Sequence, residues 1–301
     1  MPASSRSLTY AALAVLILIW GTTWAVIRIG LRGLPPFTGV ALRFGIAAVV
    51  LLAAARLVGV RPSWDRRARM LGAVNAVLSF SLSYGVVYWA EQWVPSGLAS
   101  VLFSTFPLMV AGLAHFALPG ERIRAASATG ILVGFAGVLV IFSEDLAALG
   151  GQETVRAAFV FLLSPFAAAV ANVVVKRWGH GVHPLSLTAP PMAATGVIMG
   201  VLAVIFERNR ELSFDPASVG ALLYLAIAGT AITFFLYFWL LDRLPATRLS
   251  LITYGIPVVA VTVGTLLLGE PFTNRMLLGS VLVLVGVSLA VGLTRKETGS
   301  T

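Results

Sequence analysis

The chain has 301 residues, of which 58% are hydrophobic and 11% are charged, with a mean hydropathy of +0.95 and a net charge of +9. Soluble domains contain about 25% charged residues, and a sphere of this size cannot hide so much apolar surface from water. The composition therefore excludes a soluble enzyme, a disordered tail and a nucleic-acid reader, and it predicts a protein embedded in lipid. The lack of cysteine excludes disulfides and thiolate metal sites.

Ten apolar runs have the length needed to cross a bilayer as helices. The first run is too long for a cleavable leader, and it carries Trp20, Trp24 and Arg28 where small residues would precede a cleavage site. The short connections leave no room for a soluble catalytic domain. The predicted spans are Thr9–Leu31, Pro36–Val58, Met70–Trp89, Pro95–Leu118, Ala125–Phe142, Val155–Lys176, Pro184–Phe206, Pro216–Leu241, Pro245–Gly269 and Asn274–Leu293.

The lysines and arginines predict an orientation. With the N-terminus in the cytoplasm, 14 of the 21 basic residues fall in cytoplasmic segments and 6 fall on the opposite side, while Arg43 lies within a span. Cytoplasmic loops of membrane proteins carry such an excess of Lys and Arg. We therefore expect both termini in the cytoplasm, and we attribute the basic charge to topology and not to nucleic-acid binding.

The two halves of the chain resemble each other at an offset close to 150 residues. VPSGLASVLFSTFPLM at 94–109 lies over LPATRLSLITYGIPVV at 244–259, so that Pro107 matches Pro257. Each unit, 1–149 and 150–301, holds five predicted spans. Because five is odd, the second unit enters the membrane from the opposite side. The sequence therefore predicts an all-α membrane protein of ten transmembrane helices, arranged as two inverted five-helix repeats, a design typical of secondary transporters.

Three motifs carry a resemblance to a known family. They are IWGTTWAVIRIGLRGLPPFTGVALRF (Ile19–Phe44), AEQWVPSGLAS (Ala90–Ser100), and the Pro-Gly-Glu and Gly-Glu-Pro turns after the fourth and ninth spans. Over nearly its whole length the chain resembles the EamA branch of the drug/metabolite transporter superfamily, with one EamA repeat in each half. The resemblance implies an inner-membrane carrier of small metabolites, commonly an exporter of amino acids or related compounds. It also implies that spans 1, 3, 4, 6, 8 and 9 line a central cavity, with spans 5 and 10 at the periphery.

Charged residues at or near membrane depth are candidates for gating. Arg43 lies about two turns into the second span, where a cation is costly and is usually paired or functional. We predict an outer cluster of Arg28, Arg43 and Glu91, and an inner cluster of Lys176 and Asp242, which alternate as gate locks. The alternative is a set of static ion pairs or of side chains that extend to the membrane surface.

Two prolines are candidates for hinges. Pro107 and Pro257 fall near the middle of the fourth and ninth spans, where each removes a backbone hydrogen bond and leaves a carbonyl free. Lipid tolerates such a break only where protein groups or a cavity satisfy it. Their matched positions in the two repeats favour a hinge or a binding site, and simple kinking for packing is the alternative.

Polar and aromatic side chains at helical spacing predict a substrate site. In lipid such groups either hold helices together or face a cavity, and the sequence leaves both uses open. A pocket rich in Trp and Tyr suits flat or aliphatic zwitterions and neutral metabolites. The candidate substrate-binding residues are Trp20, Trp24, Asn75, Ser79, Tyr84, Tyr88, Ser100, Phe103, Asn172, Tyr237 and Tyr254.

The sequence lacks the residues that ATP-driven transport, metal binding or proton antiport would need. Neither Lys176 nor Lys296, the two lysines, follows a glycine-rich loop, so a phosphate-cradling ATPase motif is absent. His180 and His183 have no neighbouring carboxylates in the sequence, and we expect neither a metal nor a cofactor. No Asp or Glu lies in the middle of a predicted span, which argues against proton antiport.

We therefore expect a secondary transporter, not an enzyme, that exports amino acids or related compounds by alternating access. Its expected partners are a small-molecule substrate and the lipid bilayer. A face of small residues, Gly130, Gly134 and Gly137, is expected to pack within the chain, with a homodimer as the alternative use. The alternative functions are a broad-specificity exporter of toxic compounds and a non-transporting membrane receptor.

Overall fold

A computed structural model describes residues 3–119, 121, 125–142, 146–270 and 273–292, and the regular elements of this part of the chain are helices. The elements include two π-helical segments, η1 and η2, and one 3-10 segment, η3. In chain order they are α1 (Ala3–Gly30), α2 (Pro36–Leu57), α3 (Arg66–Val74), η1 (Asn75–Leu82), α4 (Ser83–Ala90), α5 (Ser96–Phe103), α6 (Phe106–Ala117), α7 (Ala125–Phe142), α8 (Leu146–Phe161), α9 (Leu163–Trp178), α10 (Pro184–Phe206), α11 (Pro216–Ala226), η2 (Ile227–Ile232), α12 (Thr233–Arg243), α13 (Ala246–Leu249), η3 (Ser250–Tyr254), α14 (Gly255–Leu268) and α15 (Asn274–Gly292).

Seven helical stretches in the described residues are long and apolar enough to cross a membrane. Two shorter apolar helices follow, at Gly255–Leu268 and Asn274–Gly286. The all-α membrane protein predicted from the composition is therefore confirmed, whereas the count of ten spans in two inverted units stays a prediction. The seven stretches are Leu8–Gly30, Pro36–Leu57, Arg66–Ala90, Ser96–Ala117, Gly151–Trp178, Pro184–Phe206 and Pro216–Arg243.

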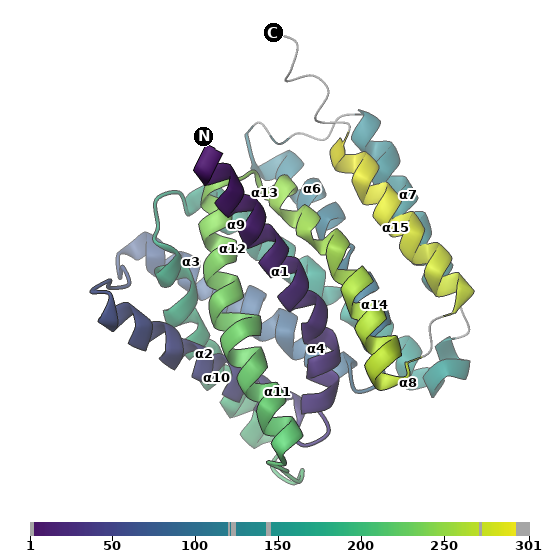
Figure 1. Cartoon of the computed structure of the whole chain (residues 1–301), viewed down its shortest axis with the longest axis horizontal. Helices are drawn as coiled ribbons and strands as arrows, with labels where there is room; N and C mark the ends of the chain where they lie inside the picture. Colours follow the sequence, from purple (N-terminus) through teal and green to yellow (C-terminus); the bar gives the residue numbers. More distant parts are fainter. Residues whose placement is uncertain (1–2, 120, 122–124, 143–145, 271–272, 293–301) are drawn as a thin grey trace.

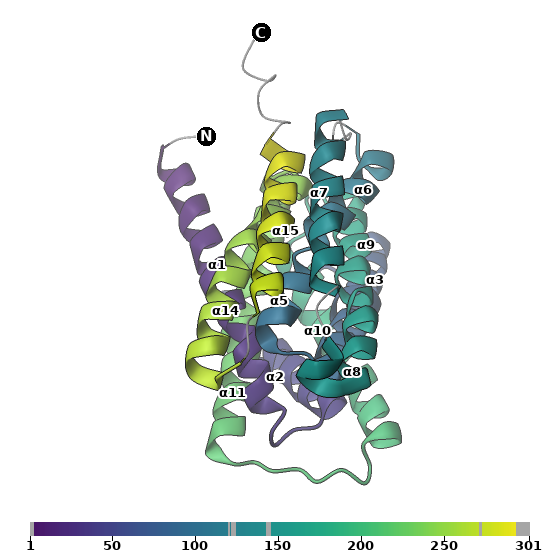
Figure 2. The ribbon, with the colours of Figure 1, turned by 90° about the vertical axis from the view of Figure 1, so that its right-hand side faces the viewer.

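The helices form a bundle whose long members run roughly along one direction (Figure 1). The first turn of α1 and the last turn of α15 lie at the same end of the bundle. Figure 2 places α8 at the opposite end, with α9 running back towards the end where α1 begins. The segments that close α1 and α9 therefore lie at opposite ends of the molecule.

Helices α7 and α15 lie side by side at one edge of the bundle (Figures 1 and 2), which agrees with the peripheral place that the resemblance implies for spans 5 and 10. Glycines allow the two backbones to meet. A Cβ atom added to Gly286 would lie 2.2 Å from the Gly134 backbone nitrogen, and one added to Gly137 would lie 2.6 Å from the Gly279 carbonyl oxygen. The predicted small-residue face therefore packs within the chain.

Two aspartates begin helices at matched positions of the two halves. Asp65 accepts the Ala68 backbone N–H at 2.7 Å ahead of α3, and Asp215 accepts the N–H groups of Ala217 and Ser218 ahead of α11. Hydrogen bonding lowers the pKa of both carboxyls below the ordinary value of 3.8: the Ala68 N–H and then the Ser63 side chain act on Asp65, and the Ser218 side chain and then its N–H act on Asp215. Each aspartate satisfies donors that the first helical turn leaves without partners.

The helices that contain the predicted hinge prolines are interrupted just ahead of them. Ser104 and Thr105 separate α5 from α6, and Pro107 stands in the first turn of α6. In the second half, the 3-10 segment η3 precedes α14, and Pro257 stands in the first turn of α14. Because proline lacks an N–H, a regular α-helical ladder cannot pass through either position.

Candidate functional site: an aromatic cavity and two charged clusters

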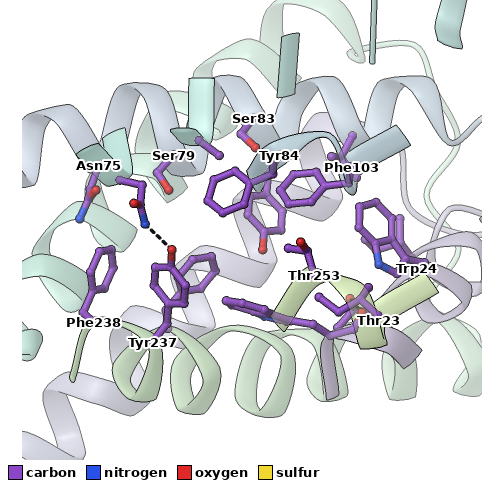
Figure 3. A pocket seen from close by; sticks show the side chains of 18 residues that line it. Thr23, Trp24, Asn75, Ser79, Ser83, Tyr84, Phe103, Tyr237, Phe238 and Thr253 are labelled. Carbon is purple, nitrogen blue, oxygen red and sulfur yellow. Dashed lines mark hydrogen bonds between the residues drawn. The ribbon is translucent and has the colours of Figure 1, made fainter. Parts of the chain in front are cut away.

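A cavity of about 90 Å³ lies among α1, η1, α4, α5, α6, α9, α12, η3 and α14 (Figure 3). These elements belong to the first, third, fourth, sixth, eighth and ninth predicted spans, the set that the resemblance implies. Eight of the predicted substrate-binding residues line the cavity: Trp20, Trp24, Asn75, Ser79, Tyr84, Phe103, Asn172 and Tyr237.

The walls of the cavity are mainly aromatic. The Trp20 ring lies 5.4 Å from the Phe234 ring and 5.5 Å from the Tyr237 ring, measured between centroids. The Trp24 ring lies 5.5 Å from the Phe103 ring. Such edge and tilted contacts between rings are favourable, so the cavity presents closely packed apolar faces to whatever occupies it.

Four polar atoms of lining residues have no hydrogen-bond partner in the described part of the chain. Two are donors, the Nε1 atoms of Trp20 and Trp24, and two are acceptors, the Oδ1 atoms of Asn75 and Asn172. The other end of each amide is engaged: Asn75 Nδ2 donates to the Leu187 carbonyl at 2.9 Å, and Asn172 Nδ2 donates to the Tyr237 hydroxyl (Figure 3). An unpaired buried polar atom is destabilising by about 1–3 kcal/mol, so these four atoms mark a place for a ligand or water.

Two predicted substrate-binding residues, Tyr88 and Ser100, do not line the cavity. The Tyr88 hydroxyl accepts a hydrogen bond from Arg43, and the Ser100 hydroxyl donates to the Gly97 carbonyl at 2.6 Å within its own helix. The side chain of Tyr254 lies outside the described part. Conversely, Phe234 and Phe238 line the cavity and were not among the predicted residues. Their spacing of four on the helix that carries Tyr237 is the pattern that predicts them.

Arg43 is fully buried and reaches across to the second half of the chain. Its Nε donates to the Thr230 hydroxyl at 2.7 Å, its Nη2 donates to the Gly229 carbonyl at 3.0 Å, and its guanidinium lies 4.7 Å from the centre of the Tyr84 ring. Its charge is thus held by a hydroxyl, a carbonyl and an aromatic face. Among the described ion pairs, Arg43 makes none with Glu91.

Arg28 lies at the centre of a group that we call the Arg28 cluster: Arg28, Glu91, Val94, Ser96, Gly97 and Glu270. Arg28 Nη1 donates to the Glu91 and Val94 carbonyls at 2.9 and 3.1 Å, and Nε lies 3.5 Å from Glu270 Oε1. Glu270 in turn accepts the backbone N–H groups of Ser96 and Gly97 and, at 2.6 Å, the Ser96 hydroxyl. The cluster ties α1, the end of α4, the start of α5 and the segment after α14 together.

A second group repeats this pattern and is named the Lys176 cluster: Lys176, Leu241, Leu244, Ala246, Thr247 and Glu121. Lys176 Nζ donates to the Leu241 and Leu244 carbonyls at 2.8 and 2.9 Å. Glu121 accepts the N–H groups of Ala246 and Thr247 and, at 2.8 Å, the Thr247 hydroxyl. Each contact with a backbone group has its counterpart in the Arg28 cluster, 148 to 150 residues away.

The predicted inner pair of Lys176 and Asp242 is not joined by a described ion pair. Asp242 instead lies 3.2 Å from the His180 Nδ1 and accepts the Gly181 N–H at 3.3 Å. The glutamates that complete the two clusters, Glu121 and Glu270, were not among the predicted site residues. Their matched Gly-Glu positions after the fourth and ninth spans are the pattern that points to them.

Comparison with known proteins places the chain in a family. The model of the EamA-like transporter family matches twice, at residues 7–143 and 155–292. The uncharacterized inner membrane transporter YedA of Escherichia coli (strain K12) is 31% identical over 277 residues, covering 88% of this chain and 84% of that protein. The uncharacterized transporter YoaV of Bacillus subtilis (strain 168) is 28% identical, over 90% of this chain and 92% of that protein.

Two further likenesses bear on substrate and fold. A protein named as a probable amino-acid metabolite efflux pump in Escherichia coli (strain K12) is 25% identical, over 92% of each chain. A solved crystal structure shares the fold, with a TM-score of 0.73 and 22% identity over 96% of this chain and 99% of the other. On the two family matches and the YedA likeness, the chain belongs to the EamA-like transporter family.

Proposed function

We propose that this protein is a secondary transporter that exports amino acids or closely related zwitterions across the bacterial inner membrane by alternating access. The four unpartnered polar atoms of the cavity carry the proposal. The indole N–H groups of Trp20 and Trp24 offer donors for a carboxylate, and the amide oxygens of Asn75 and Asn172 offer acceptors for an ammonium group. The aromatic walls take the apolar part of such a ligand.

The size of the cavity favours small metabolites over the alternative, a broad exporter of toxic compounds. Drug-sized ligands occupy pockets of about 300–1,000 Å³, whereas this cavity has about 90 Å³. A small zwitterion needs a modest widening, while a bulky drug needs the aromatic walls to separate. The likeness to the probable amino-acid metabolite efflux pump of Escherichia coli gives independent support for this substrate class.

Alternating access needs two gates and two related halves, and we infer an inverted repeat from the matched contacts. The Arg28 and Lys176 clusters join equivalent backbone groups at the closing ends of α1 and α9, which lie at opposite ends of the bundle. The double match to the family model supports the same division of the chain. With both termini in the cytoplasm, as the charge bias predicts, the Arg28 cluster is the outer one and the Lys176 cluster the inner one.

Counterflow of labelled amino acids in proteoliposomes tests the export function. A carrier accumulates the label transiently, and a receptor does not. Thermal-shift screening of amino acids, nucleosides, sugars and cationic drugs first selects the substrate, and zwitterions are expected to stabilise the protein most. Hits among cationic drugs, with none among amino acids, would contradict the proposed substrate class.

Conservative variants of the tryptophans test the site itself. Trp20→Phe and Trp24→Phe keep an aromatic wall and remove one N–H each, and each is expected to weaken substrate binding about tenfold, the loss of one hydrogen bond to a charged group. Trp64→Phe is the matched control, because Trp64 is exposed and does not line the cavity. Equal affinities in all three variants would remove the indoles from the site.

A further inference from the structure

Glu91 is a buried carboxyl group that the contacts above leave unused. It directly follows α4, just beyond the span that ends at Ala90, and its exposed fraction is 0%. Both side-chain oxygens lack a hydrogen-bond partner among the described residues, although the Glu91 backbone carbonyl accepts from Arg28. An ionised carboxylate in such a place is strongly unfavourable unless it is paired and hydrogen-bonded.

The charged groups around Glu91 are already engaged with other partners. On α1, Arg28 binds two carbonyls and Glu270, and on α2, Arg43 binds Thr230, Gly229 and Tyr88. The carboxylate of Glu270 accepts the Ser96 backbone N–H at the start of α5. On α8, which packs against α4, Glu153 and Arg156 lie at the exposed surface 3.9 Å from each other.

The neutral form of Glu91 is therefore the stable one in this arrangement. Burial raises the pKa of Glu91 well above its usual range, and the opposing effects of the Arg28 and Arg43 charges are smaller. Because neither arginine directs an N–H at the carboxylate, their attraction acts only at a distance.

The Lys176 cluster shows which kind of residue the packing requires at the position of Glu91. Leu241 stands where Glu91 stands, 150 residues later, and its carbonyl binds Lys176 as the Glu91 carbonyl binds Arg28. Leu241 is itself 2% exposed. A leucine thus serves the packing and the backbone contacts, and the fold has no need of a carboxyl group there.

We propose that Glu91 is a proton-binding site of the outer gate, neutral while the Arg28 cluster is closed and ionised when that end opens to water. The proposal rests on the alternating access proposed above. On opening, the carboxyl O–H bond breaks and the proton passes to water outside. The resulting carboxylate is hydrated and competes with Glu270 for Arg28. Re-closure takes a proton from the same side, so the step moves no net proton across the membrane.

Infrared spectroscopy of the protein in nanodiscs tests proton binding without any substrate. The carbonyl stretching band of a protonated carboxyl group is expected at neutral pH, and Glu91→Gln should remove it. Glu91→Leu, which copies Leu241, is the second variant and should remove the same band while it keeps the packing. If both variants retain the full band of the unaltered protein, Glu91 is ionised and the proposal is wrong.

Labelling of a single introduced cysteine tests the link to the gate. The chain has no cysteine of its own, and Val87 lines the cavity one turn before Glu91. In oriented proteoliposomes, we measure how fast an impermeant maleimide added outside labels Val87→Cys at external pH 6 and 8. We compare the ratio of the labelling rate at pH 8 to the rate at pH 6 between two proteins, Val87→Cys alone and Val87→Cys with Glu91→Leu. The ratio is expected to be at least about threefold larger in the protein that keeps Glu91, because the fraction of molecules with an open outer gate changes by the same factor.

The same labelling experiment separates this proposal from the export function. The pH dependence of the thiol reaction itself is the same with Glu91 and with Leu at position 91. Equal pH ratios in these two proteins would therefore overturn the proton-binding gate. A change of internal pH is expected to leave the labelling rate unchanged, and an equal response to internal and external pH would also overturn it. If the infrared band and the labelling rates behave as expected but no substrate shows counterflow, the proton-binding site is supported and the proposed export function is wrong.

Discussion

The Arg28 and Lys176 clusters are two versions of one arrangement, and their differences are informative. In both, a cation binds two carbonyls at the end of one helix and a glutamate binds two N–H groups at the start of the next. Arg28 also pairs with its glutamate at 3.5 Å, whereas the described ion pairs include none between Lys176 and Glu121. The backbone contacts are duplicated and the side-chain chemistry is not, so function is expected in the differences.

The shared part of the arrangement has a simple physical cause. Pro95 and Pro245 precede α5 and α13, and proline has no side-chain acceptor for the free N–H groups of the first turn. In a membrane, water does not satisfy such donors. A glutamate from the other half of the chain supplies the acceptor, and so it also ties that half to the start of the helix.

Removal of the two glutamates gives the largest expected effect. Glu270→Ala leaves two N–H groups and one hydroxyl without their acceptor and removes the ion pair with Arg28, and we expect a loss of about 3 kcal/mol in the free energy of unfolding. Glu121→Ala, which breaks no described ion pair, should lose about 2 kcal/mol. Thermal unfolding followed by circular dichroism measures both, with the exposed Glu211→Ala as control. A larger loss for Glu121→Ala would reverse the comparison.

A double-mutant cycle sharpens the difference between the two cations. The coupling free energy between Arg28→Ala and Glu270→Ala is expected to be about 1 kcal/mol, because the two side chains contact each other. The coupling between Lys176→Ala and Glu121→Ala should be close to zero, since each binds backbone groups of its own. Equal coupling in both cycles would mean that the ion pair adds nothing to the outer cluster.

Replacement of Pro107 or Pro257 is expected to have a smaller effect, which changes the rate of transport and leaves the stability of the protein unchanged. Pro107→Ala restores an N–H where two residues separate α5 from α6, and it is expected to slow counterflow about fivefold by letting the helix run straight. Pro257→Ala should slow it less, because the 3-10 segment η3 already connects directly to α14. Unfolding temperatures are measured alongside and should not fall. Unchanged rates in both variants would leave the prolines with a packing role.

Much of this arrangement could be predicted because it depends on local properties of the sequence. Hydrophobic length predicts the spans, and helical spacing places Trp20 and Trp24 on one face. The family resemblance implies that their helix and the helix that carries Tyr237 line a common cavity, and all three residues do line it. The use of a single polar side chain is harder to predict. Ser100 and Tyr88 are polar on faces that meet protein, but a helical pattern alone does not distinguish the cavity from a helix–helix contact.

Contacts between distant segments were the harder part. Arg43 meets Thr230, which lies 187 positions later in the chain, and Glu121 meets Thr247, which lies 126 positions later, so spacing along the chain carries no information about either pair. Depth in the membrane suggested Glu91 as the partner of Arg43, because both lie towards the same end. Depth does not give the angle around the helix axis, and that angle directs Arg43 towards η2 instead.

The smallest expected effect concerns the two aspartates that begin α3 and α11, one at each end of the molecule. Their folded-state pKa values lie below 3.8, so the stabilisation that they give is present above about pH 4 and is lost as the pH falls through the folded pKa. Asp215→Asn and Asp65→Asn keep a capping acceptor and remove this acid dependence. Unfolding temperatures between pH 5 and about pH 3 should therefore fall less steeply in each variant than in the unaltered protein. Changes of similar size are expected, because Asp215 accepts two backbone N–H groups and Asp65 accepts one backbone N–H group and the Ser63 hydroxyl.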